Sequence, residues 1–198
     1  DGNLTLSLPL NISIATVMDA LSHSLEAIWN KNANDTSTDF AITAIFTILE
    51  NGEALKASPF DLKIRKKLLN AATTAGLAFS NTTTAAAHSM SYPLTIHYGI
   101  PHGIASSISL LPLLEINGKF IKEPLDRICN NLELTFNELK QTIKAIPQGV
   151  IPYTLSEWEI PKDQLPKLAA ESFTKGRMEN NIVDLNEKDV MSILENIF

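Results

Sequence analysis

Apolar residues recur at three- and four-residue steps over much of the chain. The first such run is Ile14, Val17, Met18, Leu21, Leu25 and Ile28, and the second is Ile42, Ile45, Phe46 and Leu49. This spacing puts the apolar side chains on one face of a helix, so both runs predict amphipathic α-helices. Asn51-Gly52 predicts the end of the second helix, and Ser58-Pro59 followed by Asp61 predicts the start of a third that runs toward residue 78.

The rest of the chain predicts more helices and no sheet of any size. Helical patterns lie near 81–91, 102–116, 122–131, 135–145, 163–175 and 187–197. Valine occurs only four times, and no run of β-branched residues is bounded by hairpin turns. We therefore predict an all-α fold, with residues 1–198 forming a single helical domain.

The composition of the chain indicates which kinds of partner it is not suited to bind and in which cellular compartment it is expected. A net charge of -6 and a pI near 5.2 argue against a nucleic-acid or anionic-membrane surface, because phosphate groups need a dense basic face. The one basic cluster, residues 63–67, is interpreted as a solvated helix face. No apolar run approaches the ~20 residues of a bilayer-spanning helix. One cysteine, Cys129, and no basic residue before Lys31 favour a cytoplasmic location without a secretory leader.

Residues 68–114 contain no Asp, Glu, Lys or Arg, although 19% of the chain is charged. Such a segment is expected to be mostly interior. Three of the four histidines, His88, His97 and His102, lie within it. A buried imidazole needs partners for its nitrogens, and this segment offers only hydroxyls, amides and backbone.

Asp19 and His23 place a carboxylate and an imidazole four residues apart, on one helix face and within reach of one ion. Alone the pair is weak evidence, because an Asp/His pair at this spacing more often makes a surface or capping contact. His102 follows Pro101 and is expected to open a helix and to aim its imidazole toward the core.

Four short motifs carry the strongest functional information. They are Asp19-Ala20-Leu21-Ser22-His23-Ser24-Leu25-Glu26-Ala27, Phe79-Ser80-Asn81, His88-Ser89-Met90 and Pro101-His102-Gly103-Ile104-Ala105. In order and spacing they resemble the C-terminal, helical domain of the iron-containing alcohol dehydrogenases, which has the dehydroquinate synthase-like fold. The resemblance is close over 9–120 and looser beyond. It implies that one divalent metal ion is bound by Asp19, His23, His88 and His102.

Three imidazoles and one carboxylate suit Fe²⁺ or Zn²⁺ and would bind Mg²⁺ or Ca²⁺ poorly. The resemblance implies an NAD(P)-linked alcohol dehydrogenase or aldehyde reductase whose metal polarises the carbonyl or alkoxide during hydride transfer. It also implies that NAD(H) or NADP(H) is bound mainly by an N-terminal α/β domain absent from this chain, with a homodimer as a compatible assembly. Gly99 and Gly103 are the two closest glycines, so no glycine-rich nucleotide turn is present and the chain alone is expected to be inactive.

Tyr92 and His97 are the candidates for proton transfer. Many members of the family that the chain resembles have a further histidine four residues after the third ligand, where this chain has Tyr92, a residue of much higher ordinary pKa. The alternative interpretation of His97 is a core or pocket-lining histidine bonded to backbone. Segments 91–95 and 97–103 resemble the phosphonoacetaldehyde reductase branch, which implies a short aldehyde whose phosphonate contacts Thr95 and His97.

Other classes of metal-dependent protein fit the sequence less well. No histidine is followed by Asp, which excludes a His-Asp phosphohydrolase, and His23 lacks the Glu and second His of a zinc protease. A dehydroquinate-synthase-like zinc lyase stays open because it shares the architecture. A non-catalytic helical domain with a structural metal also stays open, and a closed four-ligand site would favour it.

Overall fold

The structure, a computed structural model, describes all of residues 1–198. It contains eleven α-helices: α1 (Leu10–Ile28), α2 (Asp35–Asn51), α3 (Ala54–Ala57), α4 (Leu62–Thr82), α5 (Ala86–Tyr98), α6 (His102–Ser107), α7 (Leu110–Asn117), α8 (Lys122–Leu132), α9 (Phe136–Ala145), α10 (Leu165–Glu171) and α11 (Glu187–Asn196). Five short 3-10 helices lie between them. The only β pairing is an isolated antiparallel bridge between Asn30 and Asn181. The predicted all-α fold is confirmed.

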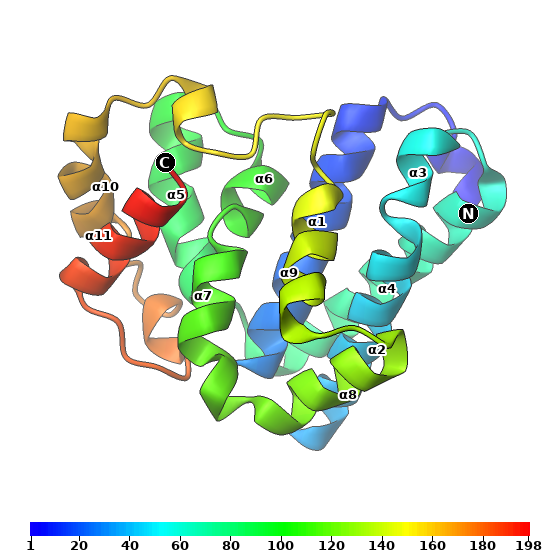
Figure 1. The fold of residues 1–198 in the computed structure, drawn as a ribbon, viewed down its shortest axis with the longest axis horizontal. Helices are drawn as coiled ribbons and strands as arrows, with labels where there is room; N and C mark the ends of the chain where they lie inside the picture. Colours follow the sequence, from blue (N-terminus) through cyan, green and yellow to red (C-terminus); the bar gives the residue numbers. More distant parts are fainter.

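The helix α1 is the centre of the fold and packs against α2, α4, α5 and α6 (Figure 1). Its apolar positions Ile14, Met18, Leu21 and Leu25 are almost completely buried. They join a cluster of 48 buried apolar residues that includes side chains from α2 through α11. Removing this surface from water is the main force that holds the helices together.

Several helix boundaries differ from the prediction. The helix α4 continues to Thr82, and the backbone then turns at Thr83, where φ is 64°. The helix expected near 81–91 is α5, which starts at Ala86 and continues through Pro93 to Tyr98. Proline usually ends a helix because it has no N–H to donate, but here Pro93 is buried within the helix. The helix expected over 102–116 is broken into α6 and α7.

The uncharged segment is interior in two stretches of its second half. Residues 84–94 are buried apart from half-buried Tyr92, and residues 103–110 are all buried. The part that belongs to α4 instead has an exposed, uncharged face that includes Ala72, Thr73 and Leu77. Small and hydroxyl side chains of this kind make a helix face that water tolerates without charge.

The basic cluster at the start of α4 is only partly solvated. Lys63, Lys66 and Lys67 are exposed, as predicted, but Arg65 has 4% exposure. Its guanidinium turns inward and donates hydrogen bonds to the backbone carbonyls of Thr5, Leu8 and Pro59. The residue therefore ties the segment before α1 to α4 rather than facing water.

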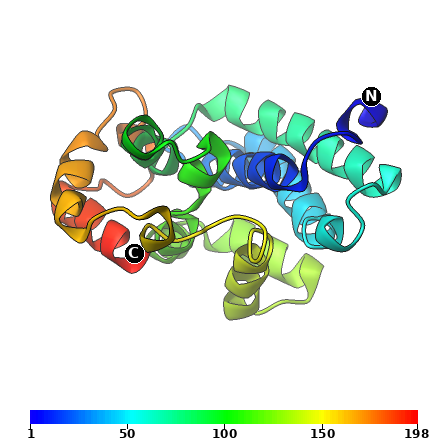
Figure 2. The same ribbon diagram turned by 90° about the horizontal axis from the view of Figure 1, so that it is seen from above.

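The helices α8 and α9 project from one side of the remaining helices (Figure 2). No single helix is long and apolar enough to cross a membrane. One bent pair of segments, His102–Phe120 followed by Lys122–Leu132 at 115°, meets the requirements for a membrane span by length and composition only.

Candidate metal centre

The helices α1, α5 and α6 each contribute side chains to one cluster of histidines around Asp19. Asp19 and His23 lie one turn apart on α1, and His23 Nδ1 is 3.7 Å from Asp19 Oδ2. His88 lies in the first turn of α5, and its Nε2 is 3.6 Å from Asp19 Oδ1. His102 is the first residue of α6, and its Nε2 is 3.7 Å from the same oxygen.

The four residues differ in depth. The His88 side chain is 4% exposed and forms the floor of the cluster, whereas the His102 side chain is 48% exposed and forms its rim. Asp19, His23 and His88 each offer a ligand atom, and these atoms lie within 4.8 Å of one another. His102 is not part of that tightest group. All four residues expected from the sequence are nevertheless brought together around the Asp19 carboxylate.

Gly103 allows α6 to approach α1 closely at this point. A Cβ on Gly103 would lie 2.0 Å from the Ala15 carbonyl oxygen and 2.9 Å from Asp19 Cβ. No side chain fits there, so glycine is required for α6 to start beside Asp19. Pro101 precedes the helix, and His102 opens it, as the sequence predicts.

The separations within the cluster fit a shared cation better than direct hydrogen bonds. The three contacts from imidazole nitrogens to Asp19 oxygens, at 3.6 to 3.7 Å, are too long for hydrogen bonds. Ligand atoms around one tetrahedral Zn²⁺ are expected about 3.4 Å apart. His88 Nε2 is moreover buried without any hydrogen-bond partner. Since an unpaired buried polar atom is costly, the donor set fits a metal ion.

Buried polar residues behind the cluster hold two of its members in place. Glu26 is fully buried, and its Oε2 lies 2.6 Å from His88 Nδ1 while its Oε1 accepts a 3.1 Å hydrogen bond from the His88 backbone N–H. Ser106 Oγ donates a 2.9 Å hydrogen bond to Asp19 Oδ1. The sequence analysis assigned no role to Glu26 or Ser106. Glu26 comes seven residues after Asp19 and thus shares its face of α1, which is the pattern that points to it.

Opposing effects act on the pKa values of these groups. Burial lowers the pKa of His88, but the charge of Glu26 and the nearby Asp19 carboxylate outweigh burial and raise it to about 9. Burial and then the nearby His88 lower the pKa of His23. Burial raises the pKa of Asp19, but His88 and His23 outweigh it and lower the value. The negative charges of Asp19 and Glu26 therefore outweigh the effect of burial on His88, and an environment of this kind attracts a cation.

The family model for the C-terminal part of the Fe-containing alcohol dehydrogenase family matches residues 13–198. The chain belongs to this family.

Two solved structures and one sequence relative illustrate the likeness. The long-chain-alcohol dehydrogenase 1 of Geobacillus thermodenitrificans is 29% identical over 100% of this chain and 53% of its own length. A 1,3-propanediol oxidoreductase structure matches with a TM-score of 0.86 at 27% identity, over 100% of this chain and 55% of that one. The sulfoacetaldehyde reductase of Bifidobacterium kashiwanohense, solved with NAD⁺, matches with a TM-score of 0.82 at 25% identity, over 100% and 53%. The chain thus spans about half the length of the relatives it matches.

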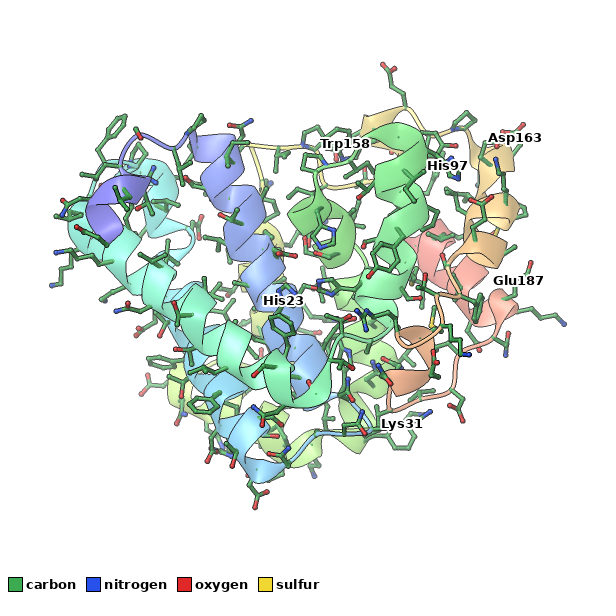
Figure 3. All side chains as sticks on the ribbon, turned by 180° about the vertical axis from the view of Figure 1, so that it is seen from behind. His23, Lys31, His97, Trp158, Asp163 and Glu187 are labelled. Carbon is green, nitrogen blue, oxygen red and sulfur yellow. The ribbon has the colours of Figure 1, made fainter.

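Tyr92 and His97, the two proton-transfer candidates, lie on different sides of α5. Tyr92 comes one turn after His88 and so shares its face. His97 comes nine residues after His88, about two and a half turns, which puts it on roughly the opposite side. Figure 3 shows His97 at the outer end of α5, away from His23 on α1. The structure does not bring His97 to the cluster of histidines around Asp19.

The structure contradicts the alternative interpretation of His97 as a core histidine bonded to backbone. The residue is exposed, and its Nε2 lies 2.6 Å from Glu171 Oε2 on α10, so it is neither a core histidine nor bonded to backbone. Thr95, expected beside it at an anion, donates a hydrogen bond to the Ile100 carbonyl.

Phe79 of the second motif lies directly against the cluster of histidines around Asp19. Its ring stacks on the His23 imidazole, with the centroids 4.2 Å apart and the planes 24° from parallel. The sequence analysis used Phe79 only as part of a motif. The ring restricts the orientation of His23 from the side of α4.

Proposed function

We propose that this chain is the metal-binding catalytic domain of an NAD(P)-linked alcohol dehydrogenase or aldehyde reductase. The observation that carries the proposal is the convergence of Asp19, His23, His88 and His102, with the buried Nε2 of His88 lacking any partner. These four residues would hold Fe²⁺ or Zn²⁺, the borderline cations that imidazole and carboxylate ligands favour.

When bound, the ion would act as a Lewis acid on the oxygen of the aldehyde or alcohol. The chain's own residues then have separate tasks. His102 forms the exposed rim, which marks the side from which substrate oxygen reaches the site. Tyr92, on the same face of α5 as His88, is our candidate to give a proton to that oxygen during aldehyde reduction and to take it back in the reverse direction.

The family membership and the exposure of the site favour the dehydrogenase over the two open alternatives. The matched family is one of alcohol dehydrogenases, which disfavours a dehydroquinate-synthase-like lyase. Four protein ligands would also suit a structural metal site, but a structural site is normally closed, whereas His102 here is half exposed. We place a fifth ligand, the substrate oxygen, on this open side.

We further propose that the nicotinamide cofactor is bound mainly outside this chain, by an N-terminal α/β domain. No strand or glycine-rich turn of the kind that cradles a pyrophosphate occurs among residues 1–198. The sulfoacetaldehyde reductase was solved with NAD⁺ and is about twice as long as the matched region. A location in the cytoplasm and a homodimer belong to the same proposal.

The finer substrate proposal is a short aldehyde with an anionic phosphonate. The structural likeness to a sulfoacetaldehyde reductase supports it, because that substrate is also a short aldehyde with an anion. The site wall in α5 and α6 has no lysine or arginine to pair with the anion. We therefore place the cation that would bind it on the part of the full-length protein that faces the cluster.

The full-length protein, loaded anaerobically with Fe²⁺ or Zn²⁺, tests the proposal by NADH or NADPH oxidation. We expect turnover with aldehydes, loss of turnover after chelation, and a kcat that is about 10²–10⁴-fold lower in Tyr92→Phe with unchanged metal content. His97→Ala, on the other side of α5, serves as the control and should retain activity. Metal-independent turnover would contradict the proposed mechanism.

The substrate proposal is tested in the same assay. Phosphonoacetaldehyde should be reduced far more efficiently than propionaldehyde, because a site that pairs a buried anion discriminates against its absence. Equal kcat/KM for the two aldehydes would reject the phosphonate substrate and leave the general activity standing.

A further inference from the structure

Glu26 is a buried carboxylate without a lysine or arginine partner. Its side chain has no exposed surface, and it lies on α1 between Leu25 and Ala27, both of which belong to the apolar core. A buried carboxylate is costly unless hydrogen bonds and opposite charge offset the loss of water. Its recorded hydrogen bonds both come from one residue, His88.

The two carboxylate oxygens act on two different groups of His88. Oε1 accepts the backbone N–H of His88, which is in the first turn of α5 and has no partner within its own helix. The residue before α5, Ala85, provides no side-chain cap, so Glu26 caps the helix from α1. Oε2 faces the ring nitrogen Nδ1 at 2.6 Å.

The second contact determines which imidazole nitrogen is available. An ionised carboxylate can only accept hydrogen bonds, so the Nδ1 that faces it has to carry the proton. When a metal ion displaces the other ring proton, the neutral ring keeps Nδ1–H and offers the lone pair of Nε2, the buried atom that lies toward Asp19 without a partner. Partners of metal-bound histidines commonly orient the ring and select its tautomer in this way.

We propose that Glu26 is a positioning residue that selects the His88 tautomer and fixes the ring so that Nε2 binds the metal ion. The inference rests on the proposed metal site. Glu26 touches neither substrate nor metal in this role, and acts only through His88. The chain has a built-in comparison, because His23 faces Asp19 with Nδ1 and makes no hydrogen bond to a buried carboxylate.

Glu26→Gln is the direct test in the 198-residue chain. Glutamine has nearly the same shape but offers one acceptor and one donor group, so one of the two His88 donors loses its partner or the ring adopts the other tautomer, with a proton on Nε2. We expect Zn²⁺ affinity, measured by competition with a chromophoric chelator, to fall about 10–100-fold. Ser24→Ala is the matched control, because Ser24 is also fully buried on α1 and its hydroxyl bonds only to the Ala20 carbonyl.

A purely structural cap would give a different result. Glu26→Gln would then lower the melting temperature of the metal-free protein but bind Zn²⁺ like the wild type wherever it is folded, which would overturn the inference. Wild-type chain that binds no Zn²⁺ would overturn the proposed function itself, and the inference with it.

Histidine tautomers in the wild-type chain give a second test that does not depend on how the variant folds. Long-range ¹H–¹⁵N NMR of the Zn²⁺-loaded protein should show His88 with a proton on Nδ1 and the metal on Nε2. Metal on Nδ1, or a proton on Nε2, would contradict the assignment whatever the affinities are.

Discussion

Asp19 organises the cluster at the scale of single residues. Its two oxygens face three imidazoles from three helices, and Ser106 supports one of those oxygens. The carboxylate is the one negative charge that reaches every histidine of the site. The histidines reach this carboxylate only because the backbones of their helices pack closely around it. Gly103, where α6 touches α1, is the clearest case.

Gly103→Ala is expected to destabilise the protein and to weaken metal binding. The added methyl would overlap the Ala15 carbonyl oxygen at 2.0 Å, so α6 would have to move away from α1 and take His102 with it. Overpacking of this kind costs about 1–3 kcal/mol. Urea unfolding and chelator competition measure the two effects.

Gly76→Ala is the matched control for this substitution. Gly76 is a helical residue of α4, and a Cβ there would meet nothing within 4 Å. We expect a gain of about 0.5–1 kcal/mol from the better helix propensity of alanine, with metal affinity unchanged. Equal effects at the two glycines would contradict the close approach of α6 to α1.

The sequence could identify the four metal-site candidates but not the residues that hold them. Asp19 and His23 form a local pair, and His102 opens a helix after proline, so their pattern is visible in the sequence. Glu26 shares the helix face of Asp19, but its partner His88 lies 62 positions away, so the spacing alone does not give Glu26 a role. His97 is a residue type that suits such a site, but the sequence does not show that its position on α5 lies away from the cluster.

At the scale of elements, α1 combines core and site. Its apolar residues pack against the surrounding helices, while Asp19, His23 and Glu26 form a polar stripe at helical spacing. Periodicity predicted this helix well because one face is continuously apolar. The boundaries of α5 were predicted poorly because the helix continues through Pro93, which only tertiary packing allows.

Arg65 is expected to be a major link between α4 and the segment before α1. Arg65→Met keeps much of the apolar stem but removes the donors to the carbonyls of Thr5, Leu8 and Pro59. The Thr5 carbonyl keeps the Leu8 N–H, but leaving the Leu8 and Pro59 carbonyls without a protein partner should cost about 2–4 kcal/mol in the free energy of unfolding. Lys67→Met, on the exposed side of the same turn, should change it by less than about 0.5 kcal/mol. Similar losses in both variants would show that Arg65 is not a specific link.

The start of α9 should contribute stability that depends on pH. Hydrogen bonds from the Thr135 side chain and backbone lower the pKa of Glu138. A carboxyl whose pKa is lower when folded stabilises the protein above its unfolded pKa, about 4.3, and this contribution is lost as pH falls through the folded value. The melting temperature of the wild type should therefore exceed that of Glu138→Gln near pH 7, and the difference should shrink below about pH 4. A difference that is constant with pH would contradict the ionised cap.

At the scale of the whole molecule, the chain covers about half the length of its relatives and has no nucleotide-binding turn. We expect the isolated 198-residue chain to fold, because it has a continuous core, but to show no saturable binding of NADH or NADPH and no turnover. Calorimetry and NADH fluorescence measure the binding. Tight cofactor binding by this chain would show that the nucleotide site has been misplaced.

Asp19, His23, His88 and His102, four residues from three helices, are proposed to bind one metal ion. Elemental analysis of the chain, purified anaerobically and supplied with Fe²⁺ or Zn²⁺, tests this binding most directly. About one equivalent per chain is expected for the wild type and for His97→Ala, and most of it should be lost in His88→Ala and in His102→Ala, because each ligand supplies a large part of the ion's binding energy. Full occupancy in either ligand variant, or no metal in the wild type, would contradict the site.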